Sequence, residues 1–87
     1  MVLPEMYSIH WNPGSLDRLP KEVIPRVIKK VESICLNPFH YLEHYEGEDV
    51  YKLRIGDYRA LINIDFTNKM LKVRIVDHRS RVYKRGF

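Results

Sequence analysis

The sequence has few of the features that mark secreted or membrane proteins. It contains a single cysteine, Cys35, so no disulfide can form within the chain. No apolar run approaches the roughly 18 residues of a membrane span, and the first residues show neither a basic start nor a continuous apolar stretch. We therefore expect a cytoplasmic protein, with Cys35 buried as an unreactive thiol in an apolar helical pattern.

The sequence also contains no internal repeat, linker or low-complexity segment. Hydrophobic residues make up 45% and charged residues 30% of the 87 positions, as in ordinary folded proteins. A chain of this length has room for one hydrophobic core. We expect residues 1–87 to form a single domain.

Charge is distributed unevenly along the chain. Residues 1–50 carry five Lys/Arg and eight Asp/Glu, a net charge of −3, whereas residues 51–87 carry ten and three, a net charge of +7. Such a basic half indicates a focused positive surface for a polyanion. The alternative is a charged surface that only contacts solvent.

Hydrophobic periodicity predicts one strand and one strong helix in the first half. Residues 6–11 alternate between apolar and polar side chains, as a half-buried strand does. Ser15 is a candidate N-cap for a short helical turn that Pro20 ends. Apolar residues then recur at helical spacing through residues 21–37, and Asn37-Pro38 closes that helix.

The second half predicts three strands. Residues 39–49 mix aromatic and acidic residues and resemble a loop, whereas residues 50–55, 58–66 and 70–78 alternate and are joined by the turn signals Gly56-Asp57 and 67–69. We expect an α+β sandwich of two layers: an N-terminal strand, a helical hairpin, then a three-stranded antiparallel meander in a four-stranded sheet. Lys52, Arg54, Lys72 and Arg74 would share the face opposite the helices.

Three segments resemble the RelE/ParE superfamily of toxins. They are the helical region that ends at Asn37-Pro38, the hairpin "YKLRIGDYRALI" and the terminal "DHRSRVYKR". Their order and spacing are similar to the RelE branch, whose members are ribosome-dependent mRNA endonucleases that inhibit translation. The resemblance implies a RelE-like fold, a RelB-like antitoxin, and a ribosome with bound mRNA as partners. It implies no cofactor, no metal and no membrane.

The resemblance also implies site residues. Lys52 and Arg54 match the paired basic positions of the family's second strand, Arg59 the arginine after the hairpin turn, and Tyr83 the C-terminal tyrosine. Arg79 and Arg81 flank the position of the family's late catalytic arginine, and both are candidates for its role. His78 matches the histidine of a glutamate–histidine pair found in one RelE-like branch, although the sequence offers no glutamate to accompany it. Further RNA-binding residues are expected at Lys72, Arg74, Lys84 and Arg85.

These residue types suit RNA cleavage without a metal, in which a ribose 2′-OH attacks the neighbouring phosphorus. Fixed cations stabilise the negative charge that builds on the phosphoryl oxygens. Arginine pairs with phosphate through two parallel hydrogen bonds, and lysine supplies a compact charge. Nearby cations also favour proton release by a phenol or an amine, which makes Tyr83 and Lys52 candidates for proton transfer, with His78 ranked below Tyr83.

Other interpretations remain open at this point. The chain could be a ParE-like toxin that binds DNA gyrase, or a basic RNA-binding module without catalysis. The cations could form surface ion pairs of little consequence, and Tyr83 could simply pack. His40 and His44 in "HYLEH", with Glu43 between them, have the spacing of a weak metal site. Tyr41 and Tyr45 are expected to cover the sheet edge or core.

Overall fold

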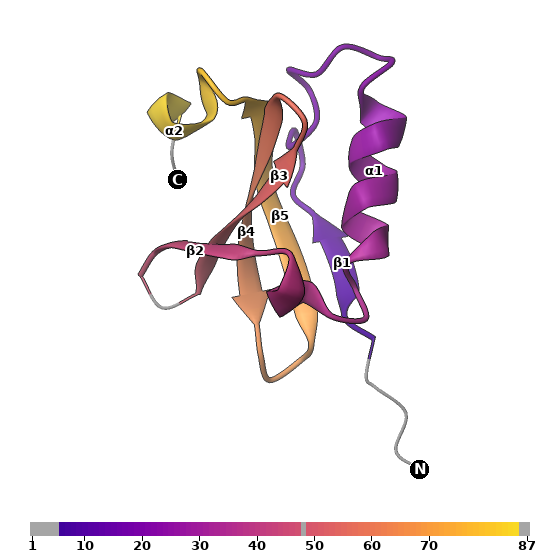
Figure 1. Cartoon of the computed structure of the whole chain (residues 1–87), viewed down its shortest axis with the longest axis vertical. Coiled ribbons are helices and arrows are strands. Elements are labelled where there is room, and N and C mark those ends of the chain that lie inside the picture. Colours follow the sequence, from indigo (N-terminus) through magenta and orange to yellow (C-terminus); the bar gives the residue numbers. More distant parts are fainter. Residues whose placement is uncertain (1–5, 48, 86–87) are drawn as a thin grey trace.

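The computed structural model describes residues 6–47 and 49–85, and a mixed five-stranded sheet runs through them (Figure 1). The elements in chain order are β1 (Ser8–Trp11), α1 (Ile24–Ser33), the 3₁₀ helix η1 (Pro38–His40), β2 (Glu43–Glu46), β3 (Val50–Ile55), β4 (Tyr58–Asp65), β5 (Met70–His78) and the short α2 (Val82–Arg85). The strand order is β1-β5-β4-β3-β2; β1 runs parallel to β5 and the other neighbours are antiparallel. The predicted α+β class and three-stranded meander are confirmed.

Helix α1 forms the second layer. Its side chains Val27 and Val31, together with Ile34 just beyond its end, recur every three to four residues and are fully buried. They pack on apolar residues of one sheet face, among them Leu53 and Ile62. This face holds the main hydrophobic core.

The predicted helical hairpin is wrong in its first half. Residues Ser15–Leu19 form successive turns, with backbone bonds such as Leu19 N–H to Leu16 O at 3.2 Å, and no helix. Five residues before a proline are too few to support a helix. Helix α1 is also shorter than the predicted 21–37. Pro25 lies in its first turn, and after Ser33 the hydrogen bonds span three residues, from Ile34 N–H to Val31 O and from Cys35 N–H to Glu32 O, as in turns.

The sheet has a fifth strand that the sequence does not indicate. Strand β2 lies within the predicted loop 39–49 and pairs with β3 as an edge strand. Its sequence, EHYE, contains no alternation of apolar and polar residues, so local sequence carries no strand signal. The segment is a strand because it pairs with β3. Glu43 lies opposite Lys52, and their side chains form an ion pair at 3.6 Å.

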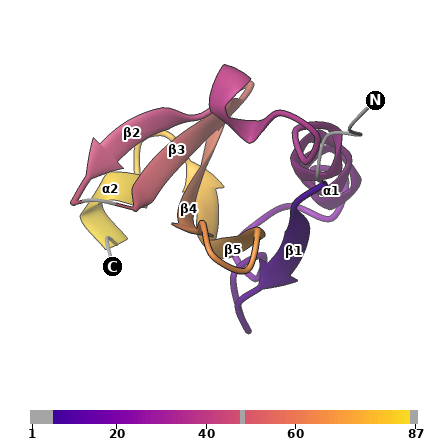
Figure 2. The ribbon, with the colours of Figure 1, turned by 90° about the horizontal axis from the view of Figure 1, so that it is seen from below.

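A β-bulge in β5 changes which side chains face the core. Leu61 of β4 pairs with Ile75 and the next residue, Ile62, pairs with Val73, so Arg74 is an extra residue on β5. Ile62 and Val73 belong to the core under α1, whereas Leu61 and Ile75 form a smaller apolar cluster. Figure 2 shows α1 and α2 on opposite sides of the sheet, and the smaller cluster lies on the side of α2.

Cys35 is buried, as expected. Its exposed fraction is 4%, its thiol donates a hydrogen bond to the Val31 carbonyl at 3.4 Å, and burial raises the pKa of the thiol. Among residues 6–47 and 49–85, no helix has the length and apolar character needed to cross a membrane.

Asp65 stabilises the turn between β4 and β5. Its carboxylate accepts hydrogen bonds from the backbone N–H of Asn68 at 3.0 Å and from the Asn68 side-chain amide at 2.9 Å. These bonds, helped by the charge of Lys72, lower the pKa of Asp65 below its usual value. Ionised Asp65 therefore stabilises the folded state at pH values above the ordinary aspartate pKa of about 3.9.

Asp65→Asn should remove this stabilisation, and the wild type should lose it as the pH falls through the lowered pKa of the folded state. We expect the wild type to unfold at a higher urea concentration than the variant above about pH 4, and the difference to shrink toward about pH 2. The exposed Asp17→Asn variant is the control. A difference between wild type and Asp65→Asn that does not change with pH would contradict this assignment.

Candidate functional site

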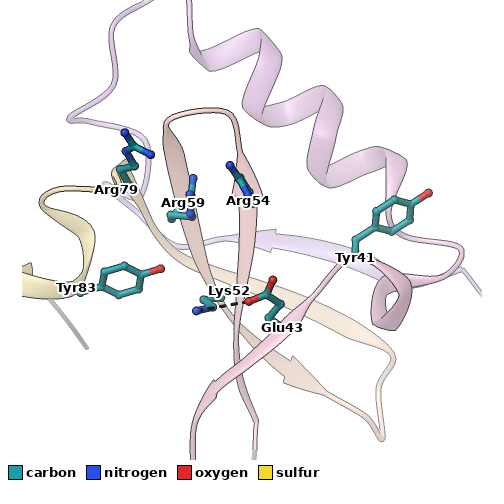
Figure 3. Close-up of a pocket in the computed structure, with 7 residues that line it drawn as sticks. All are labelled: Tyr41, Glu43, Lys52, Arg54, Arg59, Arg79 and Tyr83. Atoms are coloured by element: carbon teal, nitrogen blue, oxygen red, sulfur yellow. Dashed lines mark ion pairs between the residues drawn. The ribbon is translucent and has the colours of Figure 1, made fainter.

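The outer face of the sheet, opposite α1, carries a cationic cavity of about 370 Å³. Figure 3 shows its side chains, which come from six different segments. The cavity is lined by Tyr41, Glu43, Lys52, Arg54, Arg59, Arg79 and Tyr83. Five of these seven are site residues that the sequence predicts: Lys52, Arg54, Arg59, Arg79 and Tyr83.

Strand alternation places the cations together. Leu53 and Ile55 of β3 are buried under α1, so Lys52 and Arg54 project from the other face. Arg54 lies directly opposite Arg59 on β4. Two like charges in this position are destabilising unless an anion or another acceptor compensates them.

The structure compensates only part of this charge. The Arg59 guanidinium donates hydrogen bonds from Nη1 to the backbone carbonyls of Gly56 at 2.7 Å and Tyr58 at 2.8 Å, which fixes it beside the hairpin turn. Arg54 has no ion-pair partner among the described residues. Arg79 is held near the same turn by its backbone N–H, which donates to the Asp57 carbonyl at 2.8 Å. The cavity therefore carries uncompensated positive charge, which a bound anion would neutralise.

Groups that could exchange protons lie at the other end of the cavity. Lys52 Nζ is 3.6 Å from Glu43 Oε2 and 6.0 Å from the centre of the Tyr83 ring. In Figure 3 the Tyr83 hydroxyl points toward the cationic side chains. A carboxylate, an ammonium group and a phenol thus lie beside the space in which the arginines would hold an anion.

Helix α2 carries Tyr83 and is anchored by an apolar contact. Val82 is fully buried in the smaller cluster with Leu61 and Ile75. The Tyr83 ring packs against Tyr45 with ring centres 5.2 Å apart. Tyr83 itself is 39% exposed, so its ring is supported on one side and open to the cavity on the other.

Several predicted RNA-binding residues lie elsewhere. Lys72 and Arg74 share the outer face, as expected, but Lys72 pairs with Asp65 at 3.9 Å and Arg74 donates a hydrogen bond to Asn63 Oδ1 at 2.8 Å. Neither lines the cavity. Lys84 is exposed on α2 and does not line it either. The side chain of Arg85 lies outside the part of the chain that the structure describes.

Arg81 and His78 are also outside the cavity lining. Arg81 Nε lies 3.3 Å from Oδ1 of the buried Asp77, which also accepts the His78 backbone N–H at 2.7 Å. Nδ1 of the His78 ring accepts the Ser80 backbone N–H at 3.2 Å and lies 2.8 Å from the Ser80 hydroxyl oxygen, and the ring packs edge-on against Tyr58. Of the two arginines proposed for the late catalytic position, Arg79 is the one in the cavity.

Sequence reasoning missed Glu43 and Tyr41 as residues of this site. Glu43 falls in a segment that the sequence predicts as a loop, and its position beside Lys52 depends on β2 pairing with β3. Tyr41 is 45% exposed, and Lys30 Nζ lies 5.0 Å from the centre of its ring. Local sequence gives no signal for either contact.

The weak metal pattern at His40 and His44 does not come together with other ligands. His40 packs against Tyr41, and His44 bonds to the Gly47 carbonyl and packs against Tyr51. Within residues 6–47 and 49–85, no group of three His, Cys, Asp or Glu side chains is close enough to hold a metal ion.

A family comparison identifies the chain. The sequence model described as "ParE toxin of type II toxin-antitoxin system, parDE" matches residues 14–83. The chain belongs to the ParE toxin family. This match covers most of the chain and confirms the predicted membership of the RelE/ParE superfamily. A search of the curated proteins found no relative.

Solved structures of RelE toxins share the fold of this ParE-family chain. The toxin–antitoxin complex RelBE2 from Mycobacterium tuberculosis matches with a TM-score of 0.75 at 22% identity, over 86% of this chain and 93% of that one. The archaeal RelE–RelB complex from Pyrococcus horikoshii gives 0.71 at 23% identity, over 90% and 100%. A mutant of E. coli RelE in the free state gives 0.66 at 21%, over 95% and 100%.

The anchoring role of Val82 can be tested with Val82→Ala. Removing two methyl groups between Leu61 and Ile75 should release α2, so we expect faster amide exchange at residues 82–85 and a weaker nuclear Overhauser effect between the Tyr45 and Tyr83 rings. Val76→Ala is the control in the main core: it should lower the free energy of unfolding by about 1–3 kcal/mol and leave the tyrosine contact intact. An undisturbed tyrosine contact in Val82→Ala would disprove the anchor.

Proposed function

We propose that this chain is a single-domain toxin that cleaves mRNA in the decoding site of the ribosome and thereby inhibits translation. The observation that supports it best is the cavity on the outer face, where Lys52, Arg54, Arg59 and Arg79 meet Tyr83 and Glu43. Fixed cations beside groups that can move protons are what phosphodiester cleavage by a ribose 2′-OH requires.

In this proposal the arginines bind the scissile phosphate. Arg54, Arg59 and Arg79 approach the cavity from two paired strands and from the segment after β5. As the 2′-oxygen attacks the phosphorus and the bond to the 5′-oxygen breaks, negative charge grows on the phosphoryl oxygens. Guanidinium groups held by a sheet stabilise that charge without moving during the reaction.

Proton transfer is assigned to Glu43, Lys52 and Tyr83. One of the first two takes the proton from the 2′-OH as its oxygen attacks the phosphorus, and the Tyr83 hydroxyl supplies a proton to the departing 5′-oxygen. Their positions support this assignment, because all three line the same cavity as the arginines. Tyr83 fits the role better than His78, which does not line the cavity.

The ribosome and an antitoxin complete the proposal. Glu43, Arg54 and Tyr83 are all exposed, so the cavity alone offers little to bend an RNA into the geometry for in-line attack. A decoding site that already holds the mRNA would supply that orientation in the cytoplasm. The similar structures from Mycobacterium tuberculosis and Pyrococcus horikoshii are toxin–antitoxin complexes, and we propose for this chain a RelB-like partner whose acidic surface covers these cations.

Primer extension on an actively translated message tests the proposal, since cleavage in the decoding site leaves new ends within codons. Tyr83→Phe should bind ribosomes nearly as well as the wild type and lower single-turnover cleavage by about 10²-fold or more. Tyr45→Phe is the matched control, because Tyr45 contacts the Tyr83 ring without lining the cavity. If the wild type leaves no new ends, the proposal fails.

The Glu43→Gln variant tests whether Glu43 is the general base or only the ion-pair partner of Lys52. As a base, Glu43 should contribute about 10²–10⁴-fold to single-turnover cleavage, while its removal should leave RNA binding unchanged or tighter, because a negative charge leaves the cavity. Glu22→Gln, an exposed carboxylate beside α1, is the control. If Glu43→Gln cleaves at the wild-type rate, the role of general base is assigned to Lys52.

Inhibition of DNA gyrase is the second candidate, because the matching family is the ParE toxin family. A gyrase supercoiling assay with the purified chain addresses it directly. Inhibition of supercoiling without mRNA cleavage would establish this alternative, and cleavage without inhibition would exclude it.

A further inference from the structure

A second hollow of about 390 Å³ lies between α1 and the end of β3. Like the first cavity it is cationic, but no carboxylate lines it. Its lining residues are Arg26, Lys29, Lys30, Ser33, Arg54, Ile55 and Gly56. We call it the α1 groove.

The α1 groove adjoins the cavity described above. Arg54 lines both hollows. Tyr41 of the cavity lies against the groove residue Lys30, whose Nζ is 5.0 Å from the centre of the tyrosine ring. Figure 3 shows Arg54 and Tyr41 on the side of the cavity that faces α1. The two hollows therefore form one basic path across the edge of β3.

The edge of β3 is open where this path crosses it. Strand β2 pairs with β3 from Val50 to Lys52, and no strand among the described residues covers the same edge at Arg54 and Ile55. The path can therefore continue from the outer face toward α1.

Ion pairs among the described residues do not explain why these cations are grouped around the groove. Arg26 and Lys29 are exposed, and neither makes an ion pair with a described residue. The Arg26 guanidinium lies over the hairpin turn: a Cβ added at Gly56 would be 2.8 Å from its Nη2. Grouping these cations with Lys30 and Arg54 around one hollow costs repulsive energy, which a bound anion would relieve.

We propose that the α1 groove is a second RNA subsite, which binds the phosphodiester backbone of nucleotides flanking the bond cleaved in the first cavity. The strand passes Arg54, and the half-exposed ring of Tyr41 offers a surface on which a base can stack. This inference rests on the proposed function. A single polyanionic strand accounts for both hollows through the shared Arg54, which favours RNA over an acidic peptide as the ligand.

Binding of a 2′-O-methyl oligonucleotide to the full chain tests the subsite, because this RNA lacks the attacking hydroxyl and stays intact. An oligonucleotide of about ten nucleotides falls within the range of about 4–16 that single-strand sites cover. The double variant Arg26→Ala with Lys29→Ala should weaken binding about tenfold. It should also reduce the slope of log affinity against log salt concentration, by roughly 0.7 for each phosphate that the variant no longer neutralises. The control, Arg18→Ala with Lys21→Ala, removes the same charge from exposed positions outside the groove.

Each outcome decides the matter. The subsite is disproved if both double variants bind the oligonucleotide with the same affinity. It is also disproved if the groove variant binds RNA normally but has a lower affinity for an acidic antitoxin. Weaker binding by the groove variant alone supports the subsite even if the wild type fails to cleave mRNA, an outcome that would remove only the proposed function. Circular dichroism checks folding, and Lys29→Gln alone replaces the double variant if that variant unfolds.

Discussion

The packing of α1 on one face of the sheet is the interaction on which the site depends. Val27 and Val31 require an apolar surface opposite them, and alternate residues of β3 and β4 supply it. Because side chains of a strand alternate between faces, the residues between those core positions must point outward. Lys52, Arg54 and Arg59 occupy such positions, so core packing also fixes the direction of the cations.

The outer face, unlike the core, contains repulsive contacts between side chains. Arg54 opposite Arg59 is an unfavourable cross-strand pair, and among the described residues the hairpin carbonyls bonded to Arg59 and the Glu43 carboxylate paired with Lys52 offset part of the local positive charge. A protein selected for stability alone would place opposite charges here. Uncompensated positive charges gathered in one cavity are typical of a functional site, where a bound ligand supplies the opposite charge.

Helix α2 illustrates how little packing is needed to place a functional side chain. The buried side chain of Val82 anchors α2 on the outer face, and the ring of Tyr45 supports Tyr83. An element held by so little buried surface opens more easily than the core strands. Tyr83 therefore lies on an element that opens more easily than the strands that carry Lys52, Arg54 and Arg59.

How much could be predicted differs between the core strands and the edge. The meander and its cationic face follow from period-two alternation, which Leu53 and Ile55 show clearly. Strand β2 could not be predicted, because an exposed edge strand has no apolar period and depends on pairing with β3. Glu43 was missed for the same reason, since its contact with Lys52 joins two different strands and is not a local feature of the sequence.

The sequence by itself determined the alternation of core and cation positions, the basic charge of the second half and the family motifs, because each depends only on the order of residues. Tertiary structure decided which cations meet. Arg79 and Arg81 are equivalent in sequence, but the carbonyl of Asp57 holds the first beside the cavity and the buried carboxylate of Asp77 pairs with the second. That choice is made by partners distant in the chain or hidden in the fold, and no local pattern contains it.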